Sequence, residues 1–150
     1  SGSKVHAIEP ETLNTTNSYT GPANLYSITS LNGHIYTGGS DGRVIKIDPE
    51  TMSQVDSYSG HEHAVEQLTT FSGRLFTASR DRSVREIDPD SMVQISAMDS
   101  GGFAYSLASV DGRLFSGDHY DTVVKHNPDR VTTVGEYSGH SNYVRALTAL

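Results

Sequence analysis

Two histidines on either side of Glu62 form the sharpest apparent metal-binding pattern in the sequence. On an extended segment, His61 and His63 can face the same side, as two ligands of one ion would. A zinc site needs at least three protein ligands, and no further histidine or carboxylate is tied to this pair by spacing. We therefore expect no metal site, a structural role for His61, and a solvated His63.

Carboxylates that recur once per repeat are the next candidates for chemistry. Asp41, Asp81 and Asp121 could suggest calcium binding or proton transfer. Each is expected in the same turn of a repeated unit, where aspartate accepts hydrogen bonds from nearby backbone amides. Catalysis needs an asymmetric arrangement, so we interpret these three residues as structural.

No motif in the sequence points to catalysis. The chain lacks a glycine-rich phosphate loop, a Gly-x-Ser-x-Gly elbow and a His-Glu-x-x-His pair. We expect no enzymatic activity and no cofactor. The absence of cysteine excludes disulfides, thiolate metal sites and a cysteine nucleophile.

The net charge of −7 argues against nucleic acid and anionic membranes as partners, because both attract basic surfaces. No apolar run approaches the roughly 20 residues that span a bilayer. We expect a cytoplasmic protein.

A tandem repeat organises the predicted secondary structure of the chain. Turn glycines fall at positions 33, 73 and 112, in steps of 40 and 39 residues. Partial copies precede and follow the three full units: Ile8–Leu13 matches 47–52, and the Gly139-His140 pair matches Gly60-His61. Repetition at this period is typical of modular architectures.

Each unit is predicted to contain four strands. In the second unit the first three are Ala64–Phe71, Leu75–Ser79 and Val84–Asp88, and the fourth corresponds to Gln54–Tyr58 of the first unit. Glycine-containing turns join the first two strands, since glycine supplies the positive φ of tight hairpins. Pro49, Pro89 and Pro128 end the third strands, because proline cannot donate to a ladder.

These residues resemble the WD-repeat β-propeller family over nearly the whole chain. The matching residues are Gly60, His61, Val65, Leu68, Gly73, Leu75, Ser79, Asp81, Val84, Ile87 and Asp88. The family's tryptophan is replaced by Ile47, Ile87 and His126. The resemblance implies a hydrogen-bonded chain that staples a blade, retained only in the unit from Gly60 to Asp99 as His61, Thr77 or Ser79, and Asp81.

The resemblance also implies that partners bind near the start of each first strand and beside the turn aspartate. On this sequence the interface candidates are Tyr26, Glu66, Arg80, Phe103, Tyr105, Tyr120, Tyr143 and Arg145. Aromatic residues and arginine dominate this set, and both types are enriched at interface hot spots. We expect a protein or peptide partner.

The predicted fold is an all-β propeller of four-stranded antiparallel blades, incomplete in one chain, with a β-trefoil as the alternative. Residues 1–20 would be the outer strands of a split blade, residues 21–59, 60–99 and 100–138 full blades, and 139–150 an inner strand. Three full blades and two partial ones, fifteen expected strands in all, are too few to close an ordinary propeller ring. We therefore expect a homo-oligomer or completion by further blades. The alternative functions are a ligand-binding or enzymatic propeller, which could be quinoprotein-like, and an engineered structural module.

Overall fold

The computed structural model describes residues 2–148, which form fourteen antiparallel strands and no helix. A hairpin of two strands comes first, followed by three sheets of four strands each, in which every strand pairs with its neighbours in sequence. The strands are β1 (Lys4–Ile8), β2 (Thr15–Thr20), β3 (Leu25–Leu31), β4 (His34–Gly39), β5 (Val44–Asp48), β6 (Ser53–Tyr58), β7 (Val65–Phe71), β8 (Arg74–Ser79), β9 (Ser83–Ile87), β10 (Gln94–Asp99), β11 (Ala104–Val110), β12 (Arg113–Asp118), β13 (Val123–Asn127) and β14 (Thr132–Tyr137).

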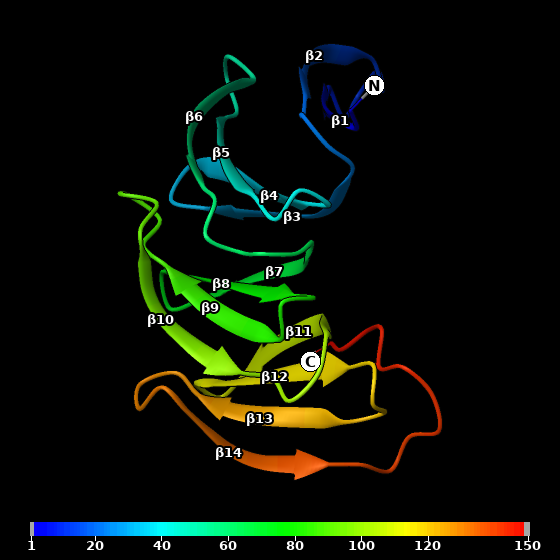
Figure 1. Ribbon diagram of the computed structural model, residues 1–150. Coiled ribbons are helices and arrows are strands. Elements are labelled where there is room, and N and C mark those ends of the chain that lie inside the picture. The colour runs from blue at the N-terminus through cyan, green and yellow to red at the C-terminus, as the bar shows by residue number, and fades with distance from the viewer. Residues whose placement is uncertain (1, 149–150) are drawn as a thin grey trace.

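We call β3–β6 the first blade, β7–β10 the second and β11–β14 the third. They follow one another as successive layers, with the β1–β2 hairpin beside the first blade (Figure 1). The chain is therefore all-β and forms an incomplete propeller of four-stranded blades, as predicted. The β-trefoil alternative is wrong, because residues 2–148 form separate sheets and no closed barrel.

Local sequence explains the blade outlines. The two-residue turn at Asn32-Gly33 has positive φ at both positions, 48° and 75°, which is the geometry that a tight hairpin requires. The third strands end at Asp48, Ile87 and Asn127, at or just before the residue preceding each proline.

Burial differs between the strands of a blade, and the outer fourth strand is the most exposed. The second strand is almost fully buried, as β8 shows, whereas every residue of the fourth strand β14 is exposed. The outer edge of each blade therefore faces solvent, while its second strand belongs to the interior.

Among the described residues, three hydrophobic cores hold the layers together, and each lies between adjacent sheets. The core between the first and second blades joins Tyr36 and Val44 to Val65, Leu75 and Ile87. Further cores join the β1–β2 hairpin to the first blade and the second blade to the third. Because each blade buries its faces only against neighbours, stability here depends on stacking rather than on one central core.

Small residues set the spacing between successive blades. A Cβ added at Gly38 of β4 would lie 2.6 Å from Val65 Cγ1 of the next blade. The same relation recurs between Gly117 and Val144, where the distance would be 2.5 Å. Residue 144 thus packs on the third blade as the first residue of β7 packs on the first blade.

The inner strand predicted within residues 139–150 differs from the structure. Residues 144–148 form no strand, and residues 149 and 150 lie outside the described part. The segment still occupies the inner-strand position, because Val144 N donates to Asp118 O at 3.0 Å and Ser106 Oγ donates to Val144 O at 2.9 Å. Strand pairing needs a neighbouring strand on the same blade, and none of the described residues supplies one.

Candidate functional site

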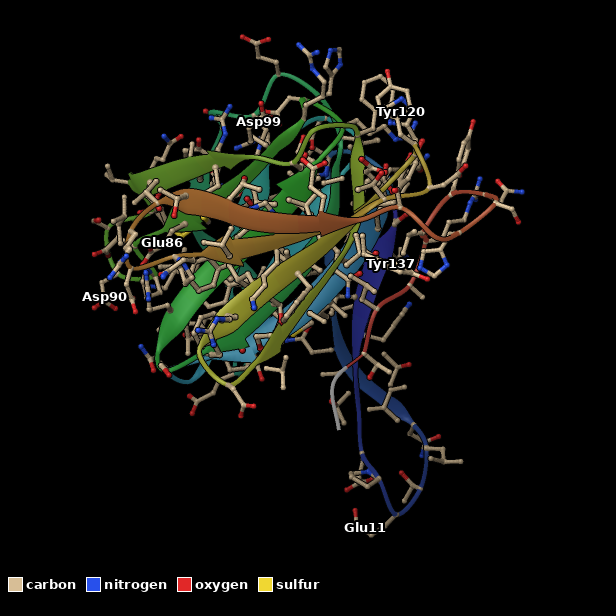
Figure 2. The ribbon with its side chains drawn as sticks, turned by 90° about the horizontal axis from the view of Figure 1, so that it is seen from below. Glu11, Glu86, Asp90, Asp99, Tyr120 and Tyr137 are labelled. Carbon is tan, nitrogen blue, oxygen red and sulfur yellow. The ribbon has the colours of Figure 1, made fainter. Side chains whose placement is uncertain are left out.

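The two ends of the blades differ in what they carry. At the end we call the loop rim lie the connections between blades and the turns after β4, β8 and β12. The opposite end, the hairpin rim, carries the turns within the β3–β4 and β5–β6 pairs and their counterparts. Figure 2 shows Tyr120, from the turn after β12, far from Asp90, which belongs to the hairpin rim. All eight predicted interface residues lie on the loop rim or just below it.

Pairing irregularities set the direction of three of these side chains. In β3, Leu25 pairs with Gly39 and Ser27 with Gly38, so Tyr26 has no opposite residue on β4. The same shift leaves Glu66 of β7 and Tyr105 of β11 unpaired. An extra residue at such a bulge re-aims its side chain. Sequence alignment found these positions, but only the register shows why they stand apart from the ladder.

A hollow of about 650 Å³ lies beside these first strands, and we call it the inner hollow. Among the residues that line it are Tyr26, Glu66, Gln67, Arg80, Tyr105 and Arg145. Five of these six are predicted interface residues, brought together from all three blades and the C-terminal segment.

Two arginines pack on one tyrosine ring at the edge of the inner hollow. The guanidinium carbons of Arg80 and Arg145 lie 5.4 and 5.9 Å from the Tyr105 ring centroid. Arg145 also lies 5.5 Å from the ring of Tyr143, which stacks on Tyr105 at 5.8 Å. Glu66 forms an ion pair with Arg80. These contacts fix the orientation of long side chains through cation–π attraction.

The other predicted aromatic residues meet around His119, which the sequence analysis missed. Its ring stacks on Phe103 at 4.3 Å and lies 3.7 Å from the ring of Tyr120 and 6.3 Å from that of Tyr143. Phe103 N donates to His119 Nδ1 at 2.9 Å, so the neutral ring carries its proton on Nε2. Tyr120 remains 64% exposed, which leaves a large apolar surface in water.

The turn of the third blade is displaced by one residue from the predicted alignment. Val123 pairs with Gly117, as Val84 pairs with Ala78, so the residue equivalent to Asp81 is Tyr120. His119, rather than Tyr120, therefore occupies the position of Arg80. Asp121 instead takes the position of Arg82, and both have positive φ, 66° and 67°.

Asp118 performs the turn role that was predicted for Asp121. Its Oδ1 accepts hydrogen bonds from the amides of Tyr120 and Thr122, each at 2.9 Å. A constant step of 39 residues from the second unit would have identified the displacement. Asp41 and Asp81 do bind local amides as predicted, at Arg43 N and Ser83 N.

The second blade contains a buried hydrogen-bonded chain on His61. Nδ1 lies 2.7 Å from Asp81 Oδ2, and Nε2 lies 2.7 Å from Thr77 Oγ1. Thr77 is therefore the hydroxyl partner, while Ser79 Oγ donates to the carbonyl of His63. Burial alone would raise the pKa of Asp81, but hydrogen bonds from His61 and Ser83 and the charge of Arg85 lower it below the ordinary value.

The order hydroxyl, imidazole, carboxylate in this chain is also that of a nucleophilic triad. Thr77 is 0% exposed and lies within β8, between two paired strands. A substrate could reach its Oγ1 only if the sheet opened. The arrangement therefore joins the start of the blade to its second strand and to its turn, and it supports no acyl transfer in the folded protein.

The equivalent hydroxyls in the other blades have different surroundings. In the first blade Thr37 Oγ1 is buried without a hydrogen-bond partner, and Pro22 occupies the position of the histidine. In the third blade Ser116 Oγ lies 2.8 Å from Nε2 of His126, a residue of β13. Burial lowers the pKa of His126 to about 4, and its Nδ1 has no partner.

Within residues 2–148 we find neither a candidate metal site nor a candidate membrane-spanning helix. No group of three or more histidine, cysteine or acidic side chains is placed to hold a metal ion. The described residues also contain no helix long and apolar enough to cross a membrane.

Comparisons with known proteins identify the fold. No family model matches the sequence, and no curated protein does. The crystal structure of the computationally designed Ika4 protein matches with a TM-score of 0.79 at 16% identity, over 87% of this chain and 82% of that one. The structure of U3-55K matches with a TM-score of 0.80 at 19% identity, over 86% of this chain and 43% of that one. At these identities the similarity establishes a shared propeller-like architecture and nothing about activity.

Proposed function

We propose that this chain is a protein-interaction scaffold of the WD-repeat propeller type, which holds a protein or peptide on its loop rim. The observation that carries the proposal is the convergence of the eight predicted side chains on one rim, where five line the inner hollow and the other three surround His119. These residues come from sequence positions 26 to 145. Exposed aromatic residues and arginine are the types that dominate interface energetics.

Two features of the blades support the WD-repeat assignment. The second blade carries a histidine, threonine and aspartate chain of the kind that the family uses to staple a blade. The order of strands within each blade and the buried second strand also fit. A scaffold needs a rigid frame with exposed side chains at one end. The buried hydrogen-bonded chain on His61 stiffens the second blade, and the loop rim carries the exposed side chains.

Assembly belongs to the same proposal. Strand β1 pairs with β2 along one edge, and its other edge has no partner strand among the described residues. A second hollow of about 440 Å³ lies between β1 and β3. Exposed apolar side chains such as Ile8 and Ile28 line it. Further blades or a second copy would cover this edge, since unpaired strand edges invite pairing. Light scattering at micromolar concentration measures this, and a monodisperse monomer with cooperative unfolding would contradict the assembly part.

Affinity capture with matched variants tests the interaction face. Phe103→Ala, Tyr143→Ala and Arg145→Ala each remove one large side chain from the loop rim. Partners retained by the wild-type chain should bind each variant at least about tenfold more weakly, as expected for loss of a hot-spot residue.

The control variants are Val93→Ala in the β9–β10 turn and Arg130→Ala in the β13–β14 turn, which remove exposed side chains from the hairpin rim. Both controls should bind partners as the wild type does. Equal binding by all three rim variants and the wild type would refute the assigned face.

A further inference from the structure

The inner hollow is electrostatically different from the rest of the molecule. Its charged lining residues are Glu66, Arg80 and Arg145, which sum to +1, whereas the whole chain carries −7. A locally positive site on an otherwise acidic protein attracts negatively charged groups at short range. The hollow therefore favours an anionic occupant.

The two arginines are not equivalent. Arg80 Nε is paired with Glu66 Oε1, and the Glu66 side chain is only 14% exposed, so that carboxylate is committed to the pair. Arg145 is exposed, and none of the described carboxylates forms an ion pair with it. Its contacts are the faces of two tyrosine rings. Cation–π packing uses the plane of the guanidinium and leaves its N–H donors free for hydrogen bonding.

The surroundings suit an extended chain rather than a compact ion. Tyr26 lies on the same hollow and is 45% exposed, and Gln67 offers an amide that can bond a peptide backbone. A volume of about 650 Å³ is within the usual range of ligand pockets and accommodates a few residues. One unpaired arginine is too few for a nucleic-acid backbone, whose binding depends on many phosphate contacts.

We propose that the inner hollow binds an acidic peptide segment of another protein, with an Asp or Glu carboxylate held in a bidentate pair by Arg145. This inference rests on the proposed interaction function and names its partner class. The stacked rings of Tyr105 and Tyr143 preorganise the guanidinium, so less side-chain freedom is lost on binding. The peptide would lie beside the first strands of all three blades.

Two pooled sets of fluorescent ten-residue peptides test the proposal. The sets are identical in their randomised positions, but one carries a central Glu and the other a central Gln. Fluorescence anisotropy measures their binding to the full chain. The Glu set should bind about tenfold more tightly, the effect of one charge-assisted hydrogen-bonded pair. The preference should weaken in 1 M salt, where screening shortens to about 3 Å.

Three variants localise the effect. Arg145→Gln should abolish the preference for the Glu set, while Arg130→Gln, the same change at an exposed arginine on the hairpin rim, should leave it intact. Glu66→Gln frees Arg80 and raises the charge of the hollow to +2, so it should strengthen binding of the Glu set. This gain does not depend on the folding of the Arg145 variant.

The outcomes separate the inference from the proposed function. Peptides that bind equally well with Glu or Gln, but lose binding on Phe103→Ala, would overturn the acidic-peptide inference and leave the interaction face standing. Acid preference that survives Arg145→Gln would overturn the inference too, and so would an absence of binding by either set. Stronger binding by single-stranded oligonucleotides than by the Glu set would replace it with a nucleic-acid site.

Discussion

His126 makes the third blade sensitive to acid. Its side chain is fully buried in β13, bonded only through Nε2 to Ser116. Desolvation lowers its pKa to about 4, although the charge of Asp99 acts in the opposite direction. In the unfolded chain a histidine titrates near 6.5. A proton therefore binds the unfolded state more tightly, and stability is lost as the pH falls below 6.5, until the loss levels off below about 4.

The size of this loss follows from the two pKa values. With 6.5 for the unfolded state and about 4 for the folded state, His126 costs about 1.4 kcal/mol at pH 5.5 and about 2.5 kcal/mol at pH 4.5. Domains of this size are stable by about 5–15 kcal/mol, so the effect is a large fraction of the total.

The variant His126→Gln removes the titration and keeps an amide that can bond Ser116. Urea unfolding followed by circular dichroism, at several pH values between about 7.5 and 4.5, gives the stability of both proteins. The wild type should lose about 2.5 kcal/mol relative to the variant across this range. The exposed His63, changed to Gln as a control, should follow the wild type. Parallel pH profiles for wild type and His126→Gln would refute the reasoning.

Two further predictions concern stability. Thr37→Val removes a buried hydroxyl that has no partner and should stabilise the chain by about 1 kcal/mol, while Thr77→Val, the same change at the equivalent position bonded to His61, should destabilise it by about 1–3 kcal/mol. Urea midpoints measure both, and equal effects at the two sites would contradict the hydrogen-bond assignment. Gly38→Ala should cost about 1–3 kcal/mol of stability through contact with Val65. Adding Val65→Ala should recover part of that cost, because Ala78 and Ala104 occupy the equivalent positions in the core between the second and third blades. If the double variant loses at least as much stability as the two single variants together, this contact does not set the blade spacing.

Much of the fold could be predicted from the sequence because the repeat is encoded locally. Positive-φ dipeptides such as Asn32-Gly33, prolines after the third strands and alternating apolar residues each act over a few residues. Repetition every 39 or 40 residues then fixes the order of strands in a blade. The pairing of His61 with Asp81 was also predictable, through the family resemblance.

The exact position of a residue within a turn and the contacts between blades could not be predicted from the sequence. The one-residue displacement after β12, which places His119 rather than Tyr120 opposite Phe103, depends on pairing between Gly117 and Val123. Likewise, Tyr105 and Arg145 are forty residues apart and meet only because the C-terminal segment packs on the third blade. Sequence periodicity sets which residues face inward along one strand, but the register of neighbouring strands and the stacking of blades determine which side chains touch, because those depend on long-range packing.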